Sequence, residues 1–180
     1  MVNASHGSYA VGGRNRVKRG HKRASYDKSV VYDILDSHFL CHVAFEVDGL
    51  PHIIPTSHWR DGNKLYWHGS SKSFMIKHLS ESNPAAVSVT HLDGLVLARS
   101  AFSTSVNYRS AICYGTPKLV TDDAVFLQQM ERFFEMLAPG RWPQLRTMTE
   151  GEHKATSLLE MEIEDAAAKV RADPPGDDDE

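Results

Sequence analysis

Tight turn signals divide much of this chain into short extended segments, and they limit its fold more than any other feature. Three such turns are present, namely Asp48-Gly49, Asp61-Gly62-Asn63 and Asp93-Gly94. Segments rich in β-branched and aromatic residues surround them at 39–47, 50–59, 64–68, 85–91, 110–120 and 156–164. Because Asp-Gly pairs close hairpins between antiparallel strands, the sequence predicts an antiparallel sheet of about six strands.

Three of these segments carry further detail. Segment 50–59 contains Pro51 and Pro55, which cannot donate to a strand ladder, so we predict a strand that is interrupted or lies at a sheet edge. Segment 110–120 contains Gly115, where we predict a bend. Segment 156–164 alternates in the way that is typical of a half-buried strand.

Two helices are predicted among the strands. The first covers residues 71–82, with Met75, His78, Leu79 and Ser82 on one side. The second follows a cap at Thr121 or Asp122, ends at Pro139-Gly140, and carries an apolar stripe of Phe126, Met130, Phe133, Phe134 and Leu137. We interpret that stripe as core packing. The predicted class is mainly β (α+β), and tight hairpins favour a barrel over a sandwich, although periodicity alone does not decide between them.

The length of 180 residues suits one domain. We expect a basic arm at 1–24, a folded domain at 25–172 and an acidic Pro/Gly tail at 173–180. The arm lacks interleaved aromatic residues and any binding motif, so we expect a solvated arm, or one that lies across a partner subunit, and no nucleic-acid partner. There is no apolar run of membrane-spanning length and no signal peptide, which predicts a cytoplasmic protein. Cys41 and Cys113 read as buried thiols.

The segment at residues 66–73 is the best candidate for chemistry. An extended run ends at His68, Gly69 frees the backbone, and hydroxyls and an amine precede the predicted helix. Ser70, Ser71, Lys72 and Ser73 are those residues, with Lys77 further along. Backbone N–H groups at a helix start, hydroxyl donors and a cation together form an anion site. The alternative is an ordinary helix cap with surplus serines.

Other chemistries find less support. The ten histidines include His52 and His58, which can share one face of a strand, but no cluster has the ligand spacing of a zinc site. We therefore predict no metal site. A Gly-x-Ser-x-Gly elbow is also missing, so hydrolysis by acyl transfer is not supported.

The chain resembles the pyridoxamine 5′-phosphate oxidase-like superfamily, in particular its branch of flavin-nucleotide-binding and 5-nitroimidazole resistance proteins. The resemblance runs from Tyr26 to Arg171, about four-fifths of the chain. It rests on the order and spacing of several motifs, namely GLPHIIP at 49–55, LYWHG at 65–69, Asn83-Pro84, NYRS at 107–110, Gly115 and AKVR at 168–171.

The resemblance implies a six-stranded antiparallel split β-barrel with flanking helices, and a homodimer with FMN at the subunit interface. FAD or haem are lesser alternatives for the cofactor. The implied cofactor residues are Ile54, Pro55 and Thr56 beside the flavin ring, His68 and Gly69 at the strand end, Ser70, Ser71, Lys72 and Ser73 around the phosphate, and Arg109 and Ser110 nearby. The anion site inferred from the residues alone thus coincides with the family's phosphate segment.

The departures from the family narrow the expected function. Phe74-Met75 stands near the place of the Arg-Lys pair of true pyridoxamine phosphate oxidases, and the Arg-rich end that grips their substrate is missing. We therefore expect that the protein is not an authentic pyridoxamine phosphate oxidase. The expected function is that of an NAD(P)H-linked oxidoreductase that acts on a small nitro or quinone acceptor. The alternatives are a non-catalytic flavin-binding protein and a haem-binding or haem-degrading relative.

His68 is the one candidate catalytic residue. Strand alternation places it on the same face as Tyr66 and opposite Trp67. The resemblance places a histidine in this context beside the flavin, where an imidazole can donate a proton during reduction. The alternative is a histidine that only fixes the loop by hydrogen bonding.

Overall fold

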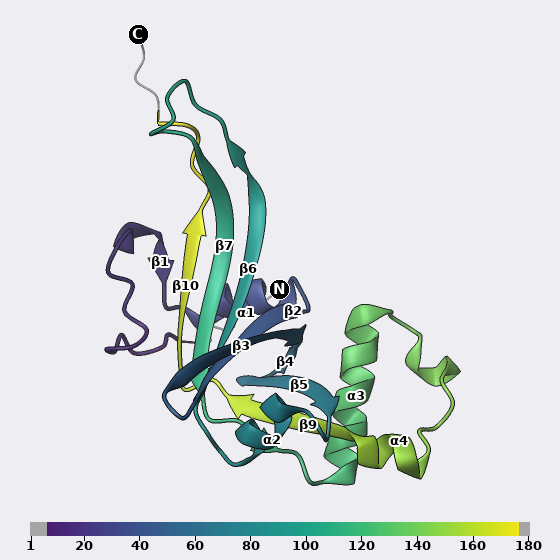
Figure 1. Cartoon of the computed structure of the whole chain (residues 1–180). Helices are drawn as coiled ribbons and strands as arrows, with labels where there is room; N and C mark the ends of the chain where they lie inside the picture. Colours follow the sequence, from purple (N-terminus) through teal and green to yellow (C-terminus); the bar gives the residue numbers. More distant parts are fainter. Residues whose placement is uncertain (1–6, 177–180) are drawn as a thin grey trace.

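The chain folds into two antiparallel β-sheets with helices packed against them (Figure 1). The computed structural model describes residues 7–176, so parts of the predicted arm and tail, at 1–6 and 177–180, lie outside the described residues. The larger sheet has the strand order β1-β10-β7-β6-β2-β3, and the smaller has the order β4-β5-β9-β8.

The elements have the following bounds. The strands are β1 (Ala24–Ser25), β2 (Leu40–Val47), β3 (Leu50–Ser57), β4 (Trp59–Asp61), β5 (Lys64–Ser70), β6 (Ala85–Val96), β7 (Ser105–Gly115), β8 (Lys118–Leu119), β9 (Thr156–Glu162) and β10 (Asp165–Arg171). The helices are α1 (Lys28–Asp36), α2 (Phe74–Ser80), α3 (Asp123–Leu137) and α4 (Glu150–Ala155), with short 3₁₀ turns η1 (His21–Arg23) and η2 (Trp142–Gln144).

The two sheets are joined where the chain passes directly from one to the other. It does so between β3 and β4, between β7 and β8, and between β9 and β10. Gly115 lies at one of these corners, and a Cβ on it would come within 2.2 Å of the Glu162 carbonyl oxygen. The predicted bend at Gly115 is therefore the place where two strands approach too closely for a side chain. The predicted mainly β, antiparallel split barrel is confirmed, with its strands divided between these two sheets.

The β2–β3 hairpin turns as predicted. Asp48 and Gly49 both have positive φ, 52° and 77°, which is the backbone that a two-residue hairpin turn requires. The proline-bearing strand β3 forms the edge of the larger sheet. Because Pro51 and Pro55 lie on this edge strand, the N–H groups that they lack are not needed for hydrogen bonds inside the sheet.

The β6–β7 hairpin corrects one prediction. Asp93-Gly94 does not end the strand, because β6 continues to Val96 through a bulge between Leu92 and Gly94. The hairpin extends well beyond the rest of the sheet (Figure 1). Its far end exposes large apolar side chains, namely Leu92, Leu95, Leu97 and Phe102.

Two apolar clusters hold the fold together. The larger packs α1 and α2 with strands of both sheets, and includes the buried side chains of Cys41, Trp67 and Cys113. The smaller packs α3 on the other face of the small sheet, where Trp59, Tyr66 and Phe133 are buried. The predicted stripe on α3 thus packs mainly as core, and both cysteines are free, buried thiols as predicted.

Other sequence predictions hold in part. The Asp122 side chain caps α3 by accepting from the N–H groups of Ala124 and Val125, as predicted. Segment 110–120 is instead divided into β7 and β8, and α2 begins three residues later than the predicted 71. The helices α1 and α4 and the strands β1 and β10 were not predicted from the residue pattern.

Candidate functional site

The candidate anion segment lies where β5 ends and α2 begins. Gly69 permits the helix to fold back, since a Cβ there would lie 3.1 Å from Cγ1 of Ile76. The turn is closed by the Ser73 N–H, which donates to the Ser70 carbonyl oxygen at 2.8 Å, and by the Lys72 N–H, which donates to Ser70 Oγ at 3.2 Å. Ser73 occupies the cap position of α2, but its side chain makes no capping hydrogen bond.

The segment keeps donors available for a ligand. Within residues 7–176, no hydrogen-bond partner is found for the hydroxyls of Ser71 and Ser73, and no ion-pair partner for Lys72 or Lys77. Lys72 is exposed and Ser71 is half-buried. The structure thus brings Ser70, Ser71, Lys72 and Ser73 together in one turn, as the sequence predicts.

His68 faces α3 from the small sheet. Its ring lies edge-on to Phe133, with centroids 4.9 Å apart, and 6.0 Å from Trp59. Tyr66 packs on this same side and Trp67 on the other, which confirms the predicted alternation. The Nδ1 atom of His68 is buried and has no hydrogen-bond partner among the described residues. Burial also lowers the pKa of His68.

A second group of rings, the histidine ring cluster, joins β2 and β3 to α2. It consists of Phe45, His52, Phe74 and His78, with ring centroids 5.2 to 6.3 Å apart. Its His78 Nε2 atom is buried without a hydrogen-bond partner in the described part of the chain. Asn83 fixes the other side of His78, because its amide donates to the His78 carbonyl oxygen at 2.7 Å and contacts Nδ1 at 3.4 Å.

This cluster connects two predicted parts of the site. Phe74 directly follows the anion segment, and His52 lies on β3 with Ile54, Pro55 and Thr56. Ile54 packs against the larger core, while Pro55 is exposed and Thr56 half-buried. Sequence reasoning missed Phe45, Phe74 and His78 as site residues. The only signals were the strand position of His52 and the helix face of His78.

Arg109 and Ser110 lie elsewhere in the chain. Both are on β7, which β6 and β2 separate from β3. The Arg109 guanidinium binds the Asp93 carboxylate through two nitrogens, at 2.9 to 3.2 Å, and Ser110 Oγ donates to the Lys169 carbonyl oxygen at 3.4 Å. Within one chain, therefore, the structure separates these two residues from Ile54, Pro55 and Thr56 on β3, and among the described residues no hydrogen bond or ion pair joins them to residues 70–73.

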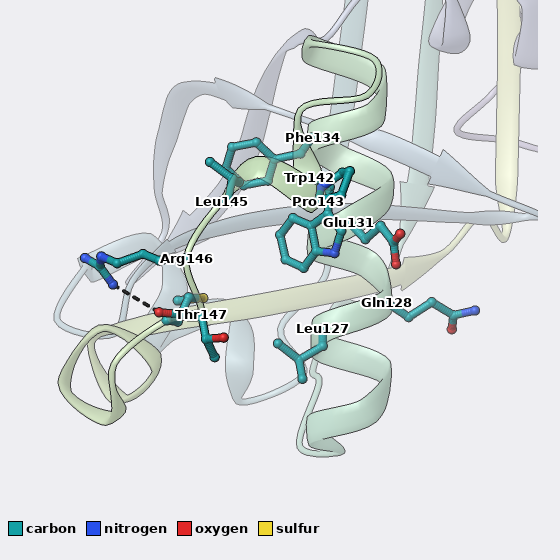
Figure 2. Close-up of a pocket in the computed structure, with 10 residues that line it drawn as sticks. Leu127, Gln128, Glu131, Phe134, Trp142, Pro143, Leu145, Arg146 and Thr147 are labelled. Carbon is teal, nitrogen blue, oxygen red and sulfur yellow. Dashed lines mark hydrogen bonds between the residues drawn. The ribbon is translucent and has the colours of Figure 1, made fainter.

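A largely apolar cavity of about 570 Å³, here called the α3 cavity, lies between α3 and the loop that follows it (Figure 2). Leu127, Phe134, Trp142, Leu145 and Met148 line it, together with Gln128, Glu131, Pro143, Arg146 and Thr147. The Arg146 guanidinium is already engaged by the protein, since it donates to both carboxylate oxygens of Glu152 at 2.6 and 2.8 Å. A continuous series of ring contacts connects this cavity with His68 through Phe133, Phe134 and Trp142.

Residues 7–176 contain neither a cluster of metal ligands nor a membrane-spanning helix. No three His, Cys, Asp or Glu side chains in this range come together as metal ligands. Its helices are all too short or too polar to cross a membrane.

Comparison with known proteins identifies the family to which this fold belongs. Residues 27–170 match the family pattern of pyridoxamine 5′-phosphate oxidase. The chain belongs to this family. The predicted resemblance is thereby confirmed, and it covers the small sheet, the anion segment, the ring cluster and β7 alike. A comparison with curated proteins gave no match.

Three solved structures show how the chain relates to other members. The flavocytochrome Anf3 from Azotobacter vinelandii is 40% identical, with a TM-score of 0.86, and the match covers 93% of this chain and 78% of that one. The FAD and haem binding protein from Mycobacterium smegmatis is 37% identical, with a TM-score of 0.82 and coverage of 87% and 77%. A Bacteroides thetaiotaomicron protein assigned to 5-nitroimidazole antibiotic resistance shares the fold at 17% identity, with a TM-score of 0.68 and coverage of 82% and 86%.

Proposed function

We propose that this protein binds a flavin nucleotide and a haem and acts in electron transfer. The observation that carries the proposal is the pair of buried imidazole nitrogens, on His68 and His78, that have no hydrogen-bond partner within residues 7–176. Buried polar atoms without a partner are rare in native proteins and call for a bound water or ligand, and an imidazole nitrogen is one that can ligate iron. The similarity to one flavocytochrome and to one FAD and haem binding protein, over most of the chain, supports the same conclusion.

The flavin phosphate would lie at residues 70–73. The unpartnered hydroxyls of Ser71 and Ser73 and the ammonium group of Lys72 suit a phosphate, because charge-assisted hydrogen bonds to phosphate are among the strongest in proteins. Both FMN and FAD carry a phosphate at this point of the molecule. FMN remains our expectation from the sequence, while the Mycobacterium smegmatis relative is described with FAD.

The haem would be held by His68 or His78. A neutral imidazole nitrogen is the common protein ligand of haem iron, and haem supplies a one-electron centre when bound. Burial lowers the pKa of His68, so its imidazole is neutral at pH 7 and keeps a lone pair available. This favours a ligand role for His68 over the proton-donor role that the sequence suggested.

We further propose a homodimer, with the far end of the β6–β7 hairpin in the interface. Leu95, Leu97 and Phe102 are 71%, 75% and 99% exposed there, which is unusual for side chains of this size in a monomer. A second subunit of the same chain would bury them. In such a dimer Arg109 and Ser110 of one subunit would serve the cofactor of the other.

A reduction of small acceptors with NAD(P)H as donor is the second candidate, and the α3 cavity favours it. The volume of about 570 Å³ suits a small ring compound, and the ring contacts connect its wall to His68. Residues of this chain would hold the acceptor there by apolar contact and exclude water from it.

An absorbance spectrum of the purified protein tests the proposal. We expect flavin bands together with a Soret band, and release of the flavin followed by mass spectrometry distinguishes FMN from FAD. Lys72→Ala should lower the affinity for FMN by about tenfold and leave the affinity for riboflavin, which lacks the phosphate, unchanged. A protein that takes up neither flavin nor haem when both are supplied would contradict the proposal. Bleaching by NAD(P)H with recovery in the presence of a quinone supports the second candidate.

A further inference from the structure

A strongly basic hollow, here called the basic cleft, lies between the N-terminal arm and β10. It has a volume of about 600 Å³ and is lined by Arg19, Gly20, His21, Lys22, Arg23, Lys169 and Asp173. It is distinct from the anion segment, since β1 and β10 belong to the large sheet, whereas β5, which leads into α2, belongs to the small one (Figure 1).

The arm that forms one wall of this cleft is fixed to the domain. Asn15 is buried, and its amide donates to the carbonyl oxygens of Ala10 and Ala166 at 2.8 and 3.3 Å. The Val17 N–H donates to the Tyr26 hydroxyl at 2.9 Å, and Arg14 pairs with Glu164 and Asp165. The loop that carries Arg19 to Arg23 is therefore held at both ends, between Val17 and β1.

Gly20 brings this loop close to Lys169. Its φ of +67° is in the left-handed region, and a Cβ on it would lie 3.3 Å from Cε and 3.4 Å from Nζ of Lys169. The lysine ammonium group is thus seated against the glycine backbone at the wall of the cleft. Any other residue at position 20 would be strained and would displace it.

Within residues 7–176, acidic side chains do not balance the charges of the cleft. Asp173 is the one acidic residue among the described residues that line it, and it pairs with Arg23 at 3.3 Å and with Arg171 at 3.8 Å. Arg19, Lys22 and Lys169 have no ion-pair partner within residues 7–176. Three unpaired cations around one hollow repel one another, and an anion placed between them would relieve that repulsion.

The basic surface continues on the other side of Lys169. A smaller hollow of about 190 Å³ is lined there by Arg14, Arg16, Lys169, Ser110 and Tyr114, with Asn15, Val17, Ile112 and Ala167. Lys169 is common to both hollows. An anion longer than a single phosphate can therefore contact Lys169 while its ends extend to either side.

We propose that the basic cleft binds a small molecule that carries a diphosphate group. Several cations without partners around a preformed hollow match the multiple charges of a diphosphate, and the adjoining hollow leaves room for an organic part such as a nucleoside. The basic cleft stands on residues other than those of the proposed flavin and haem sites, and the adjoining hollow shares Ser110 with the proposed flavin site.

Calorimetric titration of the purified full chain tests the proposal, with inorganic pyrophosphate and ADP as separate probes. We expect saturable binding that weakens steeply as NaCl is raised, because exposed charge pairs are screened by salt. Lys169→Gln and Lys22→Gln should each weaken pyrophosphate binding by about tenfold. Tighter binding of ADP than of pyrophosphate identifies a nucleotide as the occupant, and equal binding identifies the diphosphate alone.

One control variant separates the cleft from other exposed charges. Lys118→Gln removes an exposed cation on β8 and should leave pyrophosphate binding unchanged. Flavin and haem content, read by absorbance in the same samples, reports independently on the proposed function. The proposal is overturned if pyrophosphate shows no saturable binding, if Lys118→Gln weakens it as much as Lys169→Gln does, or if only a single-stranded oligonucleotide binds through Lys169.

Discussion

His58 and His68 show how two imidazoles in one protein differ in role. The His58 side chain is fully buried, and its two ring nitrogens contact the carbonyl oxygens of Phe39 and Leu35 at 3.2 and 3.1 Å. His68 has a buried nitrogen with no such contact. His58 therefore connects α1 to the corner between β3 and β4, whereas His68 is available to a ligand.

The burial of His58 makes stability depend on pH. Burial lowers the pKa of His58 to about 4, below the value near 6.5 that it has in the unfolded chain. As pH falls, the unfolded chain takes up this proton first, so the free energy of unfolding decreases from about pH 6.5 and levels off below about pH 4. The loss is on the order of 3 kcal/mol.

Urea unfolding of the wild type and of His58→Gln between pH 7 and pH 4 measures this contribution. The variant should lose most of the pH dependence in that window, even though it is less stable overall. His42→Gln, which removes an exposed imidazole on β2, is the matched control. If the free energy of unfolding fell equally with pH in the wild type and in His58→Gln, other groups would be the cause of the acid sensitivity.

The two imidazole nitrogens without a partner, on His68 and His78, give a second prediction at the residue scale. If His68 or His78 ligates haem iron, replacing that residue by Gln should lower haem content by about tenfold or more while the flavin bands stay. The Soret absorbance per mole of protein measures it, with His42→Gln again as control. Full haem content in both single variants would remove these histidines from the haem site.

Sequence reasoning reaches some of the candidate site residues and not others. The anion segment could be predicted because its glycine, hydroxyls and lysine are contiguous, so that the local turn alone brings them together. Phe45, His52 and His78 come from three elements, and their ring contacts exist only after β2, β3 and α2 have packed. The local sequence of each element therefore does not predict these ring contacts.

At the scale of elements, the corner at Gly115 is the most crowded of the glycine positions. A Cβ there would approach the Glu162 carbonyl oxygen to 2.2 Å and Met161 Cγ to 2.7 Å. Gly115→Ala should therefore force the β7 and β9 backbones apart and destabilise the protein by about 3 kcal/mol or more. Thermal unfolding of the variant measures the loss.

Gly151 provides the matched control for this substitution. It lies within α4, and a Cβ on it would meet nothing within 4 Å. Gly151→Ala should stabilise the protein slightly, by up to about 1 kcal/mol, because alanine favours helix. Equal effects of the two substitutions would contradict the role assigned to the Gly115 corner.

The elements that the sequence did not predict share one property, namely a weak or short sequence pattern. β1 is two residues long, and β10 begins with three alanines after Asp165, so they lack the β-branched pattern that marks a strand. In α1, Val30 and Val31 weaken the helical signal. In α4 the capping box of Thr149 and Glu152 was readable, but the helix that follows has only six residues.

At the scale of the whole molecule, the exposed end of the β6–β7 hairpin predicts self-association. Leu95→Asp places a charge on a side chain that a dimer would bury, so it should shift the protein toward monomer by about tenfold or more in dissociation constant. Analytical ultracentrifugation over a dilution series measures this shift.

Leu137→Asp, on the exposed side of α3, is the control for the added charge. It should leave the dimer intact. A wild-type protein that sediments as a monomer at every concentration would rule out the proposed dimer, and equal weakening by both variants would place the interface elsewhere.

The overall arrangement was predictable from the residues only as far as antiparallel pairing. The turns at Asp48-Gly49 and at residues 61–63 fix neighbours in sequence, but strands such as β5 and β9 pair across about 90 intervening residues. The split of the strands between two sheets follows from corners such as those at His58 and Gly115. The sequence predicts a bend at Gly115, but its periodicity does not show which sheet each strand joins. The family resemblance supplied that part of the fold.

The two buried thiols have a practical consequence for studying the molecule. Burial raises the pKa of both Cys41 and Cys113 to about 12, so neither forms the thiolate that alkylating reagents attack at neutral pH. A cysteine introduced at the exposed position of Phe102 would then be the fast-reacting thiol of the folded chain. A maleimide dye or nitroxide attached there would report distances between hairpin tips without any need to remove the native cysteines.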